Sequence, residues 1–405
     1  MSLTLLLDLD DTLLDNSMSE FLPAYLQAVS AHLTDLVEPS IVVQALLAGT
    51  QHMLRHQTPD CTLAENFYSY FYPAIKIAPE VIDPAIESFY AQVFPQLQSL
   101  TRPRPEAVRM VEEAFRRGYR VAIATSPLFP LTAIQQRLAW AGFSPDRHPF
   151  ALVPSIDTFH FAKPNPAYLA EILAQLGWPD EPAIMVGNDP TDDLPAAQGL
   201  GLPCFWVRPP ASTPPQENEK AIAAGSLDDF FPWLDSIPAD MLQPDFNRPS
   251  AMMAILQATP AALSSLTRDF AAHHWSKHPK AGQWSLTEII CHLRDVDAEV
   301  NLPRLRKIIQ EHNPFLPGMD TDPWAEERHY QQQDGRDALR RFTQTRITLL
   351  RLLEGLAPEG WARTARHAIF GPTTLRELVS FIVGHDRMHV RQAYETIRTI
   401  NLSAN

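Results

Sequence analysis

The sequence predicts an α/β domain with a parallel, doubly wound sheet, followed by an all-α four-helix bundle. In the first half, short apolar runs end in polar residues and lead into amphipathic helical stretches. This strand-then-helix order is typical of a parallel sheet with helices on both faces. Beyond about residue 250 the strand pattern stops and long capped helices follow, which favours a bundle. The 405 residues suffice for two or three domains.

Composition narrows the class of protein. The net charge of −14 argues against nucleic-acid binding, whose usual mark is a basic patch. Cys61, Cys204 and Cys291 are far apart in sequence, so neither a disulfide framework nor a thiolate metal site is indicated. Residues 1–7 lack the basic region of a signal peptide, and no apolar run is long enough to cross a bilayer. We therefore expect a cytoplasmic protein with neither nucleic-acid nor membrane partners.

The first half is organised around its first strand, which is expected from Leu3 to Leu7. Asp8 and Asp10 follow it two residues apart, so both carboxylates leave the strand on the same side. Open α/β sheets bind ligands beyond the carboxyl ends of their strands. Two acids there can hold a divalent cation, and one of them can attack phosphorus. The alternative is an ordinary acidic turn.

Polar residues also stand at the ends of later βα units. Thr125 follows an expected strand at 119–124, and Lys163 precedes an expected helix at 167–176. The acidic segment Gly187–Asp193 follows an expected strand at 183–186. Each also has an ordinary explanation: Thr125 as a helix cap, Lys163 as a solvated surface lysine, and the acidic segment as a turn. Their common placement at the ends of successive units instead indicates one site.

Residues 1 to about 235 resemble the haloacid dehalogenase-like (HAD) superfamily of phosphatases. The helical insert at 16–100 corresponds to the small cap type of that family. The resemblance implies a Rossmann-like core at 1–15 and 101–236. It rests on four motifs, which are matched by Asp8, Asp10 and Thr12, by Thr125, by Lys163-Pro164, and by Gly187–Asp193.

The resemblance also implies residue roles. Asp8 would be the nucleophile, passing through an aspartyl-phosphate, and Asp10 the general acid and then base. Thr125 and Lys163 would hold phosphoryl oxygens. The presence of Asp10 favours phosphate esters over haloacids, because the carbon–halogen hydrolases of the superfamily lack this second acid. A Mg²⁺ ion would sit on Asp8, the backbone carbonyl of Asp10, and the fourth motif, where the candidate ligands are Asn188, Asp189 and Asp193.

The fourth motif departs from the family pattern, which often begins Gly-Asp, because Asn188 follows Gly187 here. An amide oxygen can also bind a hard cation. Whether Asn188 or Asp189 binds the metal therefore stays open.

We place the domain boundaries at 1–236 for the hydrolase, 237–249 for a linker and 250–405 for the bundle. A proline-rich loop is expected at 209–220. In the bundle, Thr259-Pro260 predicts the start of a helix to about residue 270. Capping boxes at 285–288 and 374–377 predict helices reaching about residues 310 and 399, and a further helix is expected at 335–353.

Three histidines carry the chemistry of the bundle. His385 and His389 are four residues apart, so one helix face presents both imidazoles. His292 lies two turns into the helix that starts at 286 and is the natural third ligand. Three protein ligands with an open position are typical of a catalytic metal site. Alternatively, His292 packs in the core and the other two face solvent.

Two segments, Trp284–Leu293 and Gly384–Gln392, resemble the signature segments of the DinB-like/YfiT-like metalloprotein superfamily. This resemblance implies His292, His385 and His389 as ligands of a divalent metal such as Zn²⁺, Ni²⁺ or Fe²⁺. The metal would activate a water or an incoming low-molecular-weight thiol. Gln392 is either a partner of this site or a surface residue, and it is not counted among the site residues.

The expected function is a two-domain hydrolase. A Mg²⁺-dependent phosphatase acting on a small phosphorylated metabolite is joined to a three-histidine metal domain, which is a hydrolase or a thiol-dependent transferase. In the alternative, only the phosphatase is catalytic and the bundle is a metal-binding or dimerisation module, which would give a homodimer through its helices.

Overall fold

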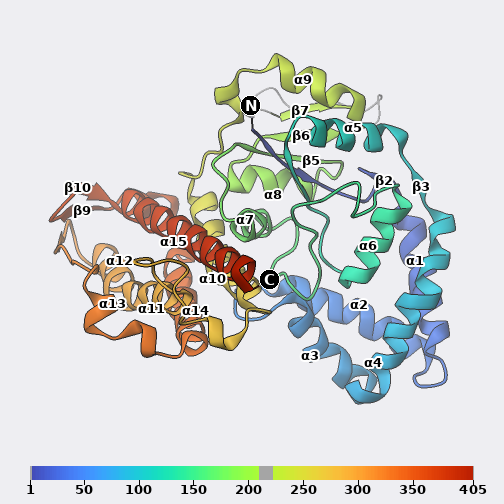
Figure 1. Cartoon of the computed structure of the whole chain (residues 1–405), viewed down its shortest axis with the longest axis horizontal. Coiled ribbons are helices and arrows are strands. Elements are labelled where there is room, and N and C mark those ends of the chain that lie inside the picture. The colour runs from blue at the N-terminus through green and yellow to red at the C-terminus, as the bar shows by residue number, and fades with distance from the viewer. Residues whose placement is uncertain (1, 209–221, 405) are drawn as a thin grey trace. The chain divides into compact units, whose positions relative to one another are not determined.

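The computed structural model describes residues 2–208 and 222–404, and the expected proline-rich loop at 209–220 lies outside them (Figure 1). The chain divides into two compact units. The first comprises Met1–Gln57, Cys61–Pro166 and Asp180–Pro244. The second comprises Thr58–Asp60, Ala167–Pro179 and Asp245–Asn405. The domain boundaries expected from the sequence stay predictions.

The first unit contains a five-stranded parallel sheet with strand order β4-β1-β5-β6-β7, which confirms the predicted fold class. The strand β1, which lies between β4 and β5, is completely buried, so its residues Leu5–Leu7 are apolar in succession and do not alternate with polar residues. Leu7 lies opposite both Ile123 and Val186, and the residues after these three strands therefore emerge at one edge. The strands are β1 (Thr4–Leu7), β4 (Arg120–Ile123), β5 (Ala183–Gly187), β6 (Cys204–Val207) and β7 (Ile222–Gly225).

Helices cover this sheet and form the insert at 16–100, which we call the cap. The helix α8 packs against β5 and β6, and α5 packs against β4. A short antiparallel pair, β2 (Leu14–Asp15) with β3 (Arg102–Pro103), joins the two ends of the cap. The cap helices are α1 (Met18–His32), α2 (Pro39–Arg55), α3 (Leu63–Ile75) and α4 (Pro79–Ser88). The other helices of the first unit are α5 (Pro105–Arg116), α6 (Leu131–Trp140), α8 (Asp193–Leu200) and α9 (Phe230–Ser236). The helix α7 (Pro166–Gln175) belongs, from Ala167 on, to the second unit.

The second unit contains the predicted bundle, in which α10 and α11 each pack against α14 and α15. A π-helical turn at Asp297–Asn301 joins α11 to α12. A small sheet of order β10-β9-β8 was not predicted, because its strands are too short to show an alternating pattern. The elements are α10 (Pro249–Thr267), α11 (Leu286–Val296), α12 (Leu302–Gln310), β8 (Phe315–Leu316), α13 (Trp324–Glu327), α14 (Gly335–Glu354), β9 (Thr364–His367), β10 (Gly371–Thr374) and α15 (Leu375–Ala404).

The predicted start of the first bundle helix at Thr259-Pro260 is wrong. The helix α10 begins at Pro249, and Pro260 lies in its interior. Proline lacks the N–H that would bond to the carbonyl of Leu256 one turn earlier. That carbonyl instead accepts a hydrogen bond from Arg346 Nη1 at 3.1 Å. A contact from another helix therefore compensates for a residue that sequence reasoning treats as a helix start.

Both predicted capping boxes are present. The Ser285 hydroxyl accepts from the Glu288 N–H at 3.4 Å, and a Glu288 carboxylate oxygen accepts from the Ser285 N–H at 2.7 Å. Thr374 and Glu377 exchange the same pair of bonds at 3.2 and 2.7 Å. These bonds satisfy N–H groups that the first turn of a helix leaves without partners. The two helices that carry the histidines therefore have well-defined starts.

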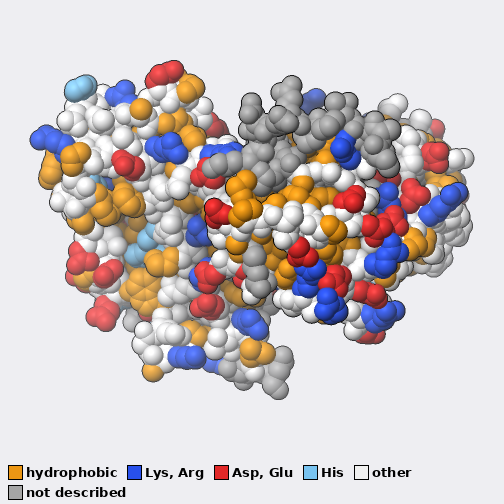
Figure 2. Space-filling model, turned by 90° about the horizontal axis from the view of Figure 1, so that it is seen from above, with side chains coloured by type: hydrophobic (Ala, Val, Ile, Leu, Met, Phe, Trp, Pro, Cys, Tyr) orange, Lys and Arg blue, Asp and Glu red, His pale blue; other side chains and the backbone are white. Residues whose placement is uncertain are grey.

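Within the described part of the chain, no helix combines the length and the apolarity needed to span a bilayer. On the face drawn in Figure 2, acidic and basic side chains are intermixed over the described surface. Charges of both signs, with an acidic excess over the whole sequence, are typical of ordinary globular proteins.

Two candidate functional sites

The first site lies at the edge of the sheet where β1 ends. Lys163 Nζ donates to Asp8 Oδ1 and to Asp193 Oδ1, each at 2.6 Å. All three side chains are buried. Burial raises the pKa of Asp193, while the neighbouring Lys163 opposes this shift. Side chains from three separate segments therefore meet around one point, as their positions at strand ends and loops predicted.

Gly187, the last residue of β5, allows this approach. A Cβ placed on Gly187 would collide with the carboxylate of Asp193. The other Asp193 oxygen, Oδ2, accepts the backbone N–H of Asp189 at 2.9 Å. The glycine in the fourth motif therefore provides the space that Asp193 occupies between the strand and Lys163.

Asp10 is held by two residues that sequence reasoning missed. Its Oδ1 accepts from Asn16 Nδ2 at 2.8 Å and forms an ion pair with Arg137 of α6. The guanidinium of Arg137 lies 5.3 Å from the ring centre of Phe21 and 5.4 Å from that of Phe129. Burial lowers the pKa of Arg137 to about 10. The sequence does contain a signal, because Arg137 falls on the apolar helix face at positions i+3 from Ile134 and i−4 from Ala141.

The remaining motif residues lie at the same edge of the sheet. Thr125 is buried and comes two residues after β4, where the Ala124 N–H still donates to the Leu7 carbonyl at 2.7 Å. Asn188 directly follows β5, and its Oδ1 accepts from the Thr12 hydroxyl at 2.9 Å. Asn188 is thus tied to the loop of the first motif.

Asp189 has a different environment from Asn188. Its Oδ1 accepts from the Thr191 N–H and hydroxyl, both at 2.6 Å, and from the Asp192 N–H at 3.1 Å. Burial alone would raise the pKa of Asp189, but these hydrogen bonds hold it below its usual value. The Oδ1 atom of Asp189 is therefore occupied by hydrogen bonds that stabilise its own turn.

The donor set of this site fits a magnesium ion. Asp8 and Asp193 offer carboxylate oxygens, and Asn188 offers an amide oxygen, which are the ligands that hard cations prefer. Since Asp8 and Asp193 each have an oxygen within 2.6 Å of the same lysine nitrogen, their carboxylates are close enough to share one ion. The backbone carbonyl of Asp10 belongs to the loop that follows β1, which also carries Asp8.

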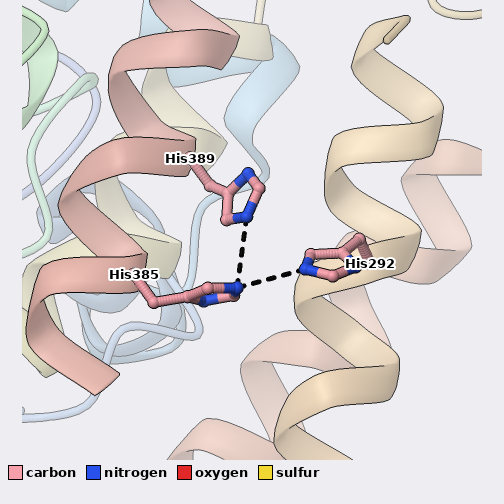
Figure 3. Close-up of side chains that lie close together, drawn as sticks. All are labelled: His292, His385 and His389. Carbon is pink, nitrogen blue, oxygen red and sulfur yellow. Dashed lines mark hydrogen bonds between the residues drawn. The ribbon is translucent and has the colours of Figure 1, made fainter. Parts of the chain in front are cut away.

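The second site lies within the bundle, where α11 and α15 face each other (Figure 3). His385 Nε2 lies 3.1 Å from His292 Nε2 and 3.2 Å from His389 Nε2. Two nitrogens bound at about 2.0–2.1 Å to one tetrahedral zinc ion would lie about 3.3 Å apart. The three ligand atoms all lie within 4.8 Å of one another, so the cluster fits a single divalent metal.

The protonation and orientation of these imidazoles also suit a metal. Burial and the neighbouring histidines lower the pKa of His292 to about 3, and burial with His389 lowers the pKa of His385 to about 3. Burial lowers the pKa of His389 as well. Neutral imidazole is the form that binds metals. His389 Nδ1 lies 2.9 Å from Gln392 Oε1, and donation of the Nδ1 proton to that oxygen leaves the Nε2 lone pair facing the other two histidines.

Two further features border the second site. Trp284, just before α11, lies nearly parallel to His389, with ring centres 5.9 Å apart and an angle of 8° between the planes. Its ring centre lies 5.0 Å from that of His292. His292 Nδ1 is buried and has no hydrogen-bond partner among the described residues. The structure thus brings together the three predicted histidines and adds Gln392, which the sequence analysis left out of the site.

The fold and the two sites define a protein with an oxygen-ligand centre at the edge of a parallel sheet and an imidazole centre in a helical bundle. Residues 3–201 match the family model of haloacid dehalogenase-like hydrolases, and residues 255–393 match that of the DinB superfamily. The chain therefore joins a haloacid dehalogenase-like hydrolase domain to a DinB-superfamily domain, which confirms both resemblances.

Individual relatives are distant. Phosphoserine phosphatase of Thermus thermophilus is 30% identical over 127 residues, which cover 31% of this chain and 49% of that protein. Phosphoglycolate phosphatase of Mesorhizobium japonicum is 29% identical over 126 residues, which cover 31% and 52%. The chain thus spans about half the length of these curated relatives. Among solved structures, YfiT from Bacillus subtilis is described as a probable metal-dependent hydrolase with an unusual four-helix bundle topology. It is 18% identical, with a TM-score of 0.35, over 41% of this chain and 91% of that one.

Proposed function

We propose that the N-terminal domain is a Mg²⁺-dependent phosphatase that hydrolyses a small phosphomonoester through an aspartyl-phosphate. The observation that carries this proposal is the position of Lys163, whose Nζ is 2.6 Å from both Asp8 and Asp193. A nucleophile, a metal-binding acid and a cation for phosphoryl oxygens are thereby held together in a buried site. The similarity to phosphoserine and phosphoglycolate phosphatases supports a small phosphorylated metabolite as substrate.

The proposed chemistry uses the chain's own residues as follows. A carboxylate oxygen of Asp8 attacks phosphorus while the ester P–O bond breaks, and Asp10 gives a proton to the leaving oxygen. A water then attacks the aspartyl-phosphate, Asp10 takes its proton, and inorganic phosphate leaves. Lys163 and Thr125 hold phosphoryl oxygens during both steps. Asp8, Asp193, the Asp10 carbonyl and either Asn188 or Asp189 would hold a magnesium ion, which would supply positive charge to neutralise the phosphoryl oxygens.

The test is phosphate release from a panel of small phosphomonoesters, measured with and without Mg²⁺. Wild type should release phosphate only with Mg²⁺, and Asp8→Asn should not release it at all. Mass spectrometry of the acid-quenched enzyme should find a phosphoryl group on the peptide that contains Asp8. Full activity in Asp8→Asn would refute the mechanism.

For the C-terminal domain we propose a divalent metal held by His292, His385 and His389, with Zn²⁺, Ni²⁺ or Fe²⁺ as candidates. Such a metal would lower the pKa of a bound water or thiol, so that the deprotonated nucleophile is available at neutral pH. The separations between the three Nε2 atoms support this assignment. The reaction would be hydrolysis, or transfer to a low-molecular-weight thiol. A non-catalytic metal-binding or dimerisation module is the alternative.

Metal analysis of wild type and His385→Ala separates these alternatives. In the catalytic case, the substitution removes both the metal and an activity on added thiol or hydrolysable substrates. In the module case, it leaves every activity unchanged and alters the oligomeric state measured by light scattering. We also propose a cytoplasmic location, which the three free cysteines support. The proposed domain boundaries are 1–236 for the hydrolase, 237–249 for the linker and 250–405 for the bundle.

A further inference from the structure

A fully satisfied arginine lies in the core of the bundle. A guanidinium has five N–H donors, and each of these in Arg346 of α14 has an acceptor. Nε and Nη2 donate to the two oxygens of Asp297 at 2.7 and 3.2 Å. Nη2 also donates to Asp386 Oδ1 at 3.0 Å, and Nη1 donates to Asp386 Oδ2. The remaining Nη1 donor bonds to the Leu256 carbonyl at 3.1 Å.

This cluster, which we call the Asp297–Arg346–Asp386 cluster, connects all four parts of the bundle. Leu256 lies in α10, Asp297 in the π-helical turn after α11, Arg346 in α14 and Asp386 in α15. The three charged side chains are at most 1% exposed. Two carboxylates surround one guanidinium, and every carboxylate oxygen accepts an N–H, a geometry that suits the ionised form. Burial raises the pKa of Asp297, and the charge and hydrogen bonds of the neighbouring Arg346 oppose this shift. With both carboxylates ionised, the cluster carries one excess negative charge away from solvent.

The cluster adjoins the three histidines along the chain. Asp386 directly follows His385, and Asp297 lies five residues after His292. A divalent cation on three neutral imidazoles brings positive charge into the same core. In a medium of low dielectric constant, opposite charges stabilise each other far more than in water.

We propose that the Asp297–Arg346–Asp386 cluster is the counter-charge of the three-histidine site: its excess negative charge raises the affinity for a divalent cation, while its hydrogen bonds hold α11 and α15 at the separation the site needs. The inference rests on the proposed metal-binding function. Arg346, Asp297 and Asp386 are positioning residues and not ligands.

The test measures metal affinity in the full-length protein after treatment with a chelator. Zn²⁺ is titrated against a chromophoric competitor, and the absorption of the Co²⁺ form reports ligand geometry. His385→Ala serves as the blank for binding elsewhere in the chain. Asp297→Asn, which removes the excess charge, should weaken Zn²⁺ binding by about 10- to 100-fold, the usual range for groups behind metal ligands.

Two variants separate charge from structure. Arg346→Lys keeps the net charge but offers three donors in place of five, so it should weaken binding less than Asp297→Asn does. Asp337→Asn removes one negative charge from a partly exposed position on the same helix and should leave affinity unchanged. The unfolding free energy of each metal-free variant is measured in urea. If affinity falls in proportion to lost stability in both Asp297→Asn and Arg346→Lys, the role is structural and the charge proposal fails.

A third variant covers the case in which Asp297→Asn does not fold. Replacing a complete buried ion cluster by apolar residues is often neutral for stability. Arg346→Met combined with Asp297→Leu and Asp386→Leu should therefore fold and bind Zn²⁺ at least about tenfold more weakly. Wild-type affinity in this variant would overturn the inference alone. Failure of wild type to bind more Zn²⁺ than His385→Ala would overturn the proposed metal function together with the inference.

Discussion

Arg346 donates to the backbone carbonyl of Leu256 at 3.1 Å, at the point where Pro260 interrupts the hydrogen bonding of α10. A proline inside a helix leaves the carbonyl one turn before it without a donor. In this bundle the missing donor is Arg346 of α14, which lies 86 residues further along the chain than Pro260. The proline and the buried arginine are thus two parts of one packing arrangement.

Arg346→Ala should strongly destabilise the bundle, because it removes the only cation among the described residues that hydrogen-bonds to the two buried carboxylates of Asp297 and Asp386, and the donor to the Leu256 carbonyl. We expect a loss of about 3–5 kcal/mol in the free energy of unfolding, measured by urea titration with circular dichroism. Arg340→Ala, on the exposed side of the same helix, breaks only a surface ion pair with Asp337 and should cost at most about 1 kcal/mol. Equal losses in the two variants would contradict the assigned role.

Gly187→Ala should impair phosphate release without a comparable loss of stability. The added Cβ would displace the Asp193 carboxylate from Lys163. A displacement of this size in a catalytic site can cost about 100-fold in rate. The matched control is Gly384→Ala, where a Cβ meets no atom within 4 Å, and phosphate release should stay at the wild-type rate. Wild-type kinetics in Gly187→Ala would show that Asp193 is not needed where the structure places it.

The variants Asn188→Ala and Asp189→Ala should differ in the Mg²⁺ concentration that they need for half-maximal activity. The Asn188 side chain accepts a hydrogen bond from Thr12 in the first motif, whereas one carboxylate oxygen of Asp189 accepts hydrogen bonds from the backbone of its own turn. We expect Asn188→Ala to raise the Mg²⁺ concentration for half-maximal activity by about tenfold or more, on the scale known for groups around a metal. Asp189→Ala should mainly lower the melting temperature. The opposite pattern would identify Asp189 as the ligand.

Gln392 should tune the metal affinity of the three-histidine site. Its Oε1 accepts the Nδ1 proton of His389 at 2.9 Å, which directs Nε2 toward the other histidines. Gln392→Ala should weaken Zn²⁺ binding by about 10- to 100-fold, and Gln392→Glu should restore or strengthen it because a carboxylate is the better acceptor. Competition titration measures both variants. If the two substitutions have the same effect, the hydrogen bond is unimportant.

Cys61 should be the cysteine that reacts in the folded protein at pH 8. Cys204 and Cys291 are completely buried, and burial raises the pKa of both thiols, that of Cys291 to about 11. Since the thiolate is the nucleophile, a raised pKa keeps these two unreactive until the pH is well above 8. Cys61 is partly exposed, and its Sγ lies 3.3 Å from His56 Nε2. Peptide mapping after iodoacetamide treatment measures the sites, with Cys61→Ser as the control and labelling of Cys204 in native protein as the contrary result.

The motif residues could be located from sequence because their signals are local. Asp8, Thr125 and Asn188 each stand just after a buried apolar run, and parallel strands bring such positions to one edge. His385 and His389 share a helix face by their spacing of four residues alone. For the same reason the capping boxes that start α11 and α15 were predicted correctly.

Other features were decided by tertiary structure. Arg137 holds Asp10 from a helix more than a hundred residues away, and the different surroundings of Asn188 and Asp189 depend on which of them reaches Thr12. The start of α10 was predicted wrongly because the donor that accommodates Pro260 lies in α14.

The sequence by itself determined the class of each domain and the order of polar residues along its strands and helices. These follow from hydrophobic periodicity and capping, which act over a few residues. Only the tertiary structure decided which buried charges face each other, because a guanidinium selects its partners by the packing of several helices, and no spacing along one chain segment encodes that choice.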